Sequence, residues 1–226
     1  MNKKIIIIAL LLQTFSLYAQ TKTARGTIPA YVDFEDIKIG VGIKPIVSRI
    51  DFITSNHFRR LGSNIDASVA YKPKKSHVGG IANIGLTTRG FYFKYPIGTQ
   101  QYFIDYQYFT TNAAVQYFPF RDGKLAINAG VQYGRLLGVG SDIEFFSNVS
   151  FYEKHYWSMV ADVEFRLLKH KNTDIALVAH YNHGLTPIYK FSVTNERGDE
   201  SDGSASFKDI GLGIVAHYHF LPTEMK

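Results

Sequence analysis

The stretch YWSMVADVEFRLLKHKNTDIALVAHYNHG, residues 156–184, decides the fold of this chain. In its first half, apolar side chains occupy every second position, namely Trp157, Met159, Ala161, Val163, Phe165 and Leu167. Most positions between them are polar: Ser158, Asp162, Glu164 and Arg166. A period of two predicts a β-strand with one apolar and one polar face. A soluble sandwich or barrel would turn the apolar face inward, whereas a membrane barrel turns it toward lipid and lines its lumen with the polar face.

Eight segments of the chain share this alternation. They are 36–44, 63–72, about 78–95, about 101–118, 124–134, the two halves of the opening stretch, and 207–220. Three connections are short, PKKSH, PFRDG and KHKN, and the Asp122-Gly123 pair in the second is a hairpin signal. Of the remaining connections, residues 96–100 form a shorter one, and residues 46–62, 135–154 and 185–206 form long loops. Short turns at one end and long loops at the other are typical of outer-membrane barrels.

The composition of the two faces favours the membrane arrangement. The polar faces are rich in Gly, Ala, Ser and Asn, which suit the narrow lumen of an eight-stranded barrel. The apolar faces place aromatic residues near the strand ends, as the interfacial girdles of membrane barrels do. These aromatics are Tyr71, Tyr92, Phe93, Tyr95, Tyr117, Phe118, Tyr133, Tyr156, Trp157, Tyr181, Tyr218 and Phe220. The sequence therefore predicts an all-β fold, an antiparallel, eight-stranded, transmembrane up-and-down β-barrel.

The N-terminal stretch MNKKIIIIALLLQTFSLYAQ predicts a secretory signal peptide, residues 1–19, with the barrel domain following at 20–226. Its apolar run is too short to span a bilayer, and the alternative is a buried N-terminal helix. The chain has no cysteine, which excludes a disulfide framework, a thiolate zinc site and a lipid anchor on cysteine. The net charge of +6 is scattered and gives no indication of nucleic-acid binding.

Several segments carry a resemblance to a known family. They are the signal ending YAQ, IGVGIKP, AAVQYFPFRDGKLAINAGVQYGRLLG, DIALVAHYNHGLTPIY and DIGLGIVAHYHF. With these, the chain resembles the small eight-stranded outer-membrane barrels of Gram-negative bacteria, especially the PorT-like outer membrane protein β-barrel group. The resemblance covers nearly the whole mature chain and implies an architecture and a place in the cell outer membrane, but no activity. The tail LPTEMK after Phe220 departs from barrels that end on the aromatic residue itself.

Charged residues and histidines on the polar faces form a candidate lumen network. Its expected members are Arg89, Asp162, Glu164, Arg166, His180, His217 and His219. Buried charges must be paired, so we expect ion pairs that fill the lumen. The alternatives are a proton or ion path, or histidines that bind a metal or act as general bases. We predict no catalytic residue, no metal site and no cofactor.

These observations predict a structural or interaction protein rather than an enzyme. The barrel would sit in outer-membrane lipid as a monomer and present loops 46–62, 135–154 and 185–206 to a protein or surface ligand, with no nucleic-acid partner. One alternative is a lipid-modifying enzyme, with His, Ser and a carboxylate on one wall near the outer leaflet. The other is a soluble exported lipocalin-like ligand carrier, with an apolar lumen. Lysines near the short turns would meet lipid phosphates, a periplasmic partner or solvent; they are Lys72, Lys74, Lys75, Lys169 and Lys171.

Overall fold

A computed structural model gives the structure of the chain. It describes residues 37–51, 57–73, 76–94, 101–120, 122–142, 152–194 and 200–220. The predicted signal peptide, Lys74, Lys75 and the tail after Phe220 lie outside these described residues. Within the described part of the chain, no helix has the length and apolar character needed to cross a membrane.

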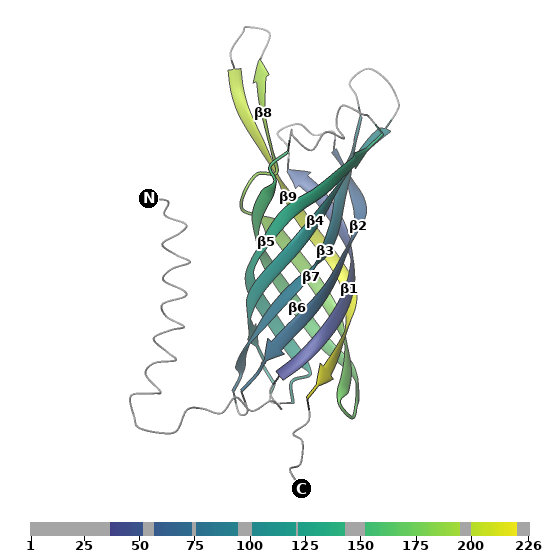
Figure 1. The fold of residues 1–226 in the computed structure, drawn as a ribbon, viewed down its shortest axis with the longest axis vertical. Helices are drawn as coiled ribbons and strands as arrows, with labels where there is room; N and C mark the ends of the chain where they lie inside the picture. Colours follow the sequence, from purple (N-terminus) through teal and green to yellow (C-terminus); the bar gives the residue numbers. More distant parts are fainter. Residues whose placement is uncertain are drawn as a thin grey trace, which may run out of the picture. The chain divides into compact units, whose positions relative to one another are not determined.

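The described chain is built from antiparallel strands that close into a ring. The strands are β1 (Ile37–Asp51), β2 (His57–Tyr71), β3 (Val78–Lys94), β4 (Gln101–Tyr117), β5 (Leu125–Ser141), β6 (His155–His170), β7 (Thr173–Gly184), β8 (Tyr189–Thr194) and β9 (Glu200–His219). Strands β1 to β7 pair in chain order, β7 pairs with β9, and β9 pairs with β1 (Figure 1). The prediction of an antiparallel, eight-stranded, up-and-down barrel is confirmed.

The two ends of the barrel differ. Strand β1 begins and β9 ends at one end, together with the short β2–β3, β4–β5 and β6–β7 connections; we call this the turn end, and the opposite end the loop end (Figure 1). Strand β8 is not part of the ring. It pairs with the first residues of β9, from Tyr189↔Ala205 to Thr194↔Glu200, and the resulting hairpin projects from the loop end.

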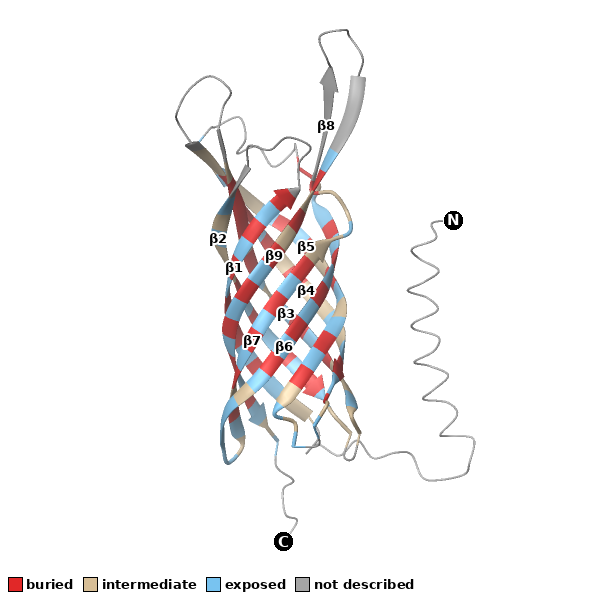
Figure 2. Cartoon of the chain, turned by 180° about the vertical axis from the view of Figure 1, so that it is seen from behind, coloured by how far each residue is buried: buried red, intermediate tan, exposed pale blue. Residues whose placement is uncertain are grey.

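The burial pattern answers the question of which face is inside. Along β6, side chains from Tyr156 to Glu164 are buried at every second position, and the residues between them are exposed (Figure 2). The buried set includes Ser158 and Asp162, whereas Met159 and Val163 are 54% and 43% exposed. An apolar exterior around a partly charged interior is the arrangement of a membrane barrel. The lipocalin-like alternative required the opposite arrangement, and the structure contradicts it.

Aromatic residues mark both ends of the apolar exterior. Trp157 lies toward the loop end of β6 and Leu167 toward its turn end, ten residues apart. At ~3.3 Å per residue and a ~40° tilt they span roughly 25 Å, the height of the lipid-facing band of such barrels. Exposed aromatics at the turn end include Tyr71, Tyr117, Phe120, Tyr218 and Phe220.

Two of the predicted exterior aromatics are instead inside the barrel. Tyr156 and Phe118 are 1% and 3% exposed. Tyr156 shares the inward alternation of Ser158, and Phe118 shares that of Gln116, so assigning them to the outer girdle was wrong. Phe93 and Tyr95 lie outside the residues whose side chains are described.

The predicted long connections are too long, because the strands continue into them. Strand β1 reaches Asp51 and β2 begins at His57, which leaves 52–56 of the expected loop 46–62. Strand β5 reaches Ser141, inside the expected loop 135–154, whereas β6 begins at His155, where that loop was expected to end. Strand β8 and the start of β9 occupy much of 185–206. Beyond the lipid a strand needs no apolar face, so polar, Gly- and Ser-rich sequence can still pair.

The depth of Val163 in the lipid-facing wall gives a stability prediction. We expect Val163→Arg to lower the free energy of unfolding by ~2–4 kcal/mol in lipid vesicles, because the charge would enter the hydrocarbon region. The matched control is Leu167→Arg, near the interface, with an expected loss of ~0–1 kcal/mol. Denaturant unfolding in vesicles measures both. Equal tolerance of the two substitutions would contradict the assignment of the outer face.

Candidate functional site in the barrel lumen

The loop end of the lumen is filled by a cluster of buried apolar side chains, here called the loop-end cluster. Its members are Ile50, Phe91, Ile104, Tyr106, Tyr108, Leu136, Tyr152, Tyr156, Ile188, Ala205 and Phe207. The Tyr106 ring meets those of Tyr152 and Phe207 edge-on, with centroids 5.1 and 5.3 Å apart. Tyr108 meets Tyr156 in the same way at 4.7 Å. Edge-to-face packing is a favourable arrangement for aromatic rings, and these rings fill the lumen across its width.

Two members of the loop-end cluster come from connections rather than from strands. Tyr152 precedes β6 and Ile188 precedes β8, and both are buried. Backbone hydrogen bonds hold these connections in place: Glu153 N–H donates to the Ile188 carbonyl at 2.9 Å, and Ile188 N–H donates to the Ala205 carbonyl at 2.8 Å. The connections therefore help to close the lumen at its loop end.

The sequence contained part of the signal for this cluster. Tyr106, Tyr108 and Phe91 follow the inward alternation of Thr110 and Arg89, so extending that alternation toward the loop end would have found them. Val139 packs against the cluster and lies just after a bulge in β5. At this bulge Leu136 pairs with Tyr108 and Gly138 pairs with Gln107, so one residue of β5 has no partner on β4. A bulge changes which residues face inward, so a period of two does not predict the residues that follow it. The same period gives no information on Tyr152 and Ile188, because they lie in connections rather than in strands.

Directly against the loop-end cluster lies a buried ion pair. Arg89 Nε is 2.8 Å from Asp209 Oδ2, and both side chains are at most 1% exposed. Three aromatic rings surround the guanidinium, with centroids at 4.7 Å for Tyr156, 5.5 Å for Phe207 and 5.8 Å for Tyr108. The cation is therefore stabilised by a carboxylate and by the faces of aromatic rings. Asp209, on the polar face of β9, was not among the expected network residues.

The middle of the lumen holds a second group of paired charges, the central network. Lys44 Nζ lies 2.7 Å from Asp66 Oδ2 and 3.9 Å from Asp162 Oδ2. His180 Nδ1 lies 2.5 Å from Asp162 Oδ1, and the two residues are direct neighbours across the β6–β7 ladder. Of the expected residues, Asp162 and His180 thus lie together here. Lys44 and Asp66 were missed, although both follow the inward alternation of their strands.

Glu164 borders the central network on β6. Its Oε1 accepts a hydrogen bond from Asn128 Nδ2 at 2.8 Å, and both side chains are buried. Arg166, two residues further along, lies at the turn end and is half-buried. Its Nη2 donates to the Asp122 carbonyl at 2.6 Å. The structure thus separates Arg166 from Asp162, although both face the lumen side of one strand.

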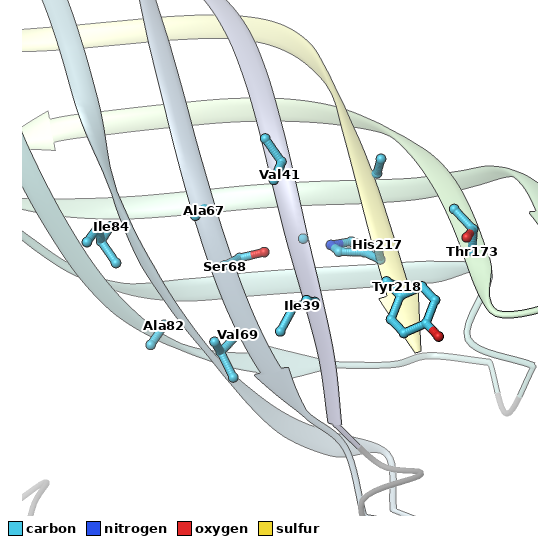
Figure 3. Close-up of a pocket in the computed structure, with 12 residues that line it drawn as sticks. Ile39, Val41, Ala67, Ser68, Val69, Ala82, Ile84, Thr173, His217 and Tyr218 are labelled. Atoms are coloured by element: carbon cyan, nitrogen blue, oxygen red, sulfur yellow. The ribbon is translucent and has the colours of Figure 1, made fainter. Parts of the chain in front are cut away.

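The remaining two expected histidines share one carboxylate at the turn end. His217 Nδ1 is 3.0 Å from Asp174 Oδ1, and His219 Nε2 is 2.7 Å from Asp174 Oδ2. His217 and Ser68 point toward one another across Gly40 (Figure 3), where a Cβ would overlap both side chains. Glycine at position 40 therefore leaves room inside the narrow lumen for the His217 and Ser68 side chains.

The histidines do not converge on one site. His180 belongs to the central network, whereas His217 and His219 lie at the turn end. In the described ranges, no three His, Cys, Asp or Glu side chains are grouped so that they could hold a metal ion. Within the described ranges, His180 and His217 each direct Nδ1 to an aspartate, and His219 directs Nε2 to one.

An apolar hollow lies on the wall of the barrel near the turn end (Figure 3). Its volume is about 550 Å³, and small residues such as Ala67, Ala82 and Ala216 leave room between larger neighbours. The larger lining residues include Ile39, Val69 and Tyr218, which are exposed. A hollow of this character fits hydrocarbon and offers little to a polar ligand.

The Arg89–Asp209 pair gives a prediction for stability. We expect Arg89→Met to lower the free energy of unfolding by ~3–5 kcal/mol, because it leaves the buried Asp209 carboxylate unpaired. The double variant Arg89→Met/Asp209→Leu should recover most of this loss, since neither side chain then carries a charge. Denaturant unfolding in detergent micelles measures both, with Lys154→Met as a surface control. A single variant as stable as the wild type, or a double variant no better than the single, would contradict the role of this pair.

Comparison with known proteins supports the fold. No protein-family model matches the chain, and a search of curated protein sequences found no match. The outer membrane protein OprG from Pseudomonas aeruginosa is similar in structure, with a TM-score of 0.53 and 11% identity over 82% of this chain and 97% of that one. Neisserial surface protein A has a TM-score of 0.51 and 10% identity over 82% of this chain and 97% of its own. The narrower resemblance to the PorT-like group stays a prediction. The chain has the fold of the small eight-stranded outer-membrane β-barrels.

Proposed function

We propose that this chain is an outer-membrane protein whose closed barrel carries an interaction surface at its loop end. The observation that carries the proposal is the length of the strands. A bilayer needs about 9–11 residues of a tilted strand. Strands β3, β4 and β5 each have 17 residues, and β9 has 20. Because the turn-end connections are short, the excess length extends at the loop end.

Two hairpins supply this surface. Pairing of β3 with β4 continues to Lys94↔Gln101, and pairing of β8 with β9 continues to Thr194↔Glu200. Paired strands hold their backbones in place before a partner arrives, which reduces the entropy lost on binding. The expected partner is a protein or a surface ligand, and the surface includes parts of the predicted loops 46–62, 135–154 and 185–206. The barrel closes on itself without a free edge, which supports a monomer.

The proposed role is neither conduction nor catalysis. The loop-end cluster and the buried ion pairs fill the lumen, and an eight-stranded barrel has little room beyond its side chains. The alternative of a lipid-modifying enzyme required His, Ser and a carboxylate on one wall near the loop end. The His180–Asp162 pair instead lies in the central network, and Asp174 with its two histidines lies at the turn end.

A conductance measurement tests the closed lumen. In a planar lipid bilayer, we expect the purified chain to insert without producing stepwise conductance, because the loop-end cluster blocks the lumen. An open porin inserted under the same conditions is the positive control. Discrete current steps from the wild-type chain would show a continuous water path and would overturn this part of the proposal.

Cysteine labelling tests the location and orientation of the barrel. The chain has no cysteine, so a single introduced thiol reports without background. Lys154→Cys places it at the loop end and His170→Cys at the turn end, and both positions are exposed. On intact Gram-negative cells, a membrane-impermeant maleimide should label Lys154→Cys and should label His170→Cys only after permeabilisation. The reverse pattern, or recovery of the chain in the soluble fraction, would overturn the proposal.

A further inference from the structure

A basic cavity opens at the turn end of the lumen. Its volume is about 210 Å³, and it is contributed by the ends of several strands and the β4–β5 turn. Four cationic side chains line it: Lys38, Lys72, Arg166 and Lys169. Two carboxylates, Asp122 and Asp174, line it as well, so positive charge is in excess. A concave site with an excess of cations attracts anions more strongly than the same charges on a flat surface.

Two of these cations converge on one point. The Nζ of Lys72 and the Nη1 of Arg166 lie 3.8 and 3.9 Å from the place where a Cβ on Gly123 would sit. Gly123 has a φ of +65°, which favours glycine, and the missing side chain leaves this space open. Both cations are held by neighbours. Lys72 lies over the Phe118 ring, 4.6 Å from its centroid, and Arg166 donates to the Asp122 carbonyl.

The two carboxylates of the cavity are engaged with other groups. Asp174 is shared by His217 and His219. Asp122 Oδ1 accepts the backbone N–H of Lys124 at 3.0 Å, and that hydrogen bond holds the pKa of the Asp122 carboxyl below its ordinary value. Among the described residues, Lys38 and Lys169 form no ion pair with either carboxylate. The ammonium groups of Lys38 and Lys169 therefore add positive charge that these two carboxylates do not pair.

A narrower hollow adjoins this cavity deeper in the lumen. The two share Lys38, Phe118, Gly123, Arg166 and Asp174. His217 lines the deeper hollow; it is 2% exposed, and its Nε2 has no hydrogen-bond partner in the described part of the chain. His217 does not line the basic cavity itself, and its imidazole points toward Ser68 across Gly40.

We propose that this turn-end cavity binds a phosphate group, held between Lys72 and Arg166 over Gly123. A guanidinium matches two phosphate oxygens with its planar set of donors, and an ammonium adds a compact charge. The phosphate could belong to the headgroup of an anionic phospholipid at the membrane surface or to a phosphorylated solute. Both present the same oxygens to the same side chains.

Calorimetric titration of the full chain in a nonionic detergent tests the proposal. The two probes are glycerol 1-phosphate and dihexanoyl phosphatidylglycerol, the latter below its micelle concentration. Acetate and dihexanoyl glycerol are the controls for charge alone and for acyl chains alone. We expect saturable binding of a phosphate probe that weakens as salt is added. Much tighter binding of the phospholipid identifies a lipid headgroup as the source, whereas equal binding of the two probes identifies a solute.

Matched variants separate the cavity from general surface charge. Lys72→Gln and Arg166→Gln should each weaken binding at least tenfold, and Arg166→Lys should give an intermediate loss because it keeps charge without the planar donors. Lys171→Gln removes the same charge from the β6–β7 turn, outside the cavity, and should bind as the wild type does. Faster migration of unheated protein on a gel checks that each variant is folded. No binding of either phosphate probe to the wild type, or an equal loss in Lys171→Gln, would overturn the proposal.

Discussion

The pairing of β1 with β9 is the interaction on which the rest of the structure depends. It runs from Lys38↔His219 to Asp51↔Ser206. Along this length both strands are hydrogen-bonded on each side, so the sheet has no open edge there. In hydrocarbon, every unpaired backbone group costs several kcal/mol, so an open sheet of these strands would not be viable in a bilayer. Closure also defines an interior from which bulk water is largely excluded. Every charged side chain that faces inward must then find a partner within the ring.

The interior meets this requirement with ion pairs between different strands, some consecutive in sequence and some far apart. Arg89 on β3 meets Asp209 on β9, and Lys44 on β1 meets Asp66 on β2. Such pairs do not guarantee greater stability than apolar packing of the same volume would give. They do penalise a shift in strand register, because a shift of one residue would turn a charge toward lipid and leave its partner unpaired inside. The ion pairs therefore contribute to the uniqueness of the register as well as to its stability.

Much of the barrel could be predicted from alternation alone, because a closed wall with different solvents on its two faces imposes a strict period of two. This holds for β6, where the inward positions of Asp162 and Glu164 and the outward positions of Met159 and Val163 follow from the sequence. Alternation failed at the bulge in β5, because the bulge breaks the period of two. It also failed at Tyr156, which was assigned to the outer face although its side chain points inward. It also could not identify partners. That Arg89 would meet Asp209, or that Arg166 would turn to the β4–β5 turn, depends on distances around the ring that no local pattern contains.

Strand β9 belongs to two structures at once. Its first residues form the projecting hairpin with β8, and the remainder forms ladders with β1 and β7. Interstrand hydrogen bonds in antiparallel ladders lie perpendicular to the strands. A pull on the hairpin along the direction of β9 would therefore load the bonds of both ladders in shear, all at once, instead of peeling them one after another. The closing seam of the barrel is therefore also the part of the chain that resists such a pull.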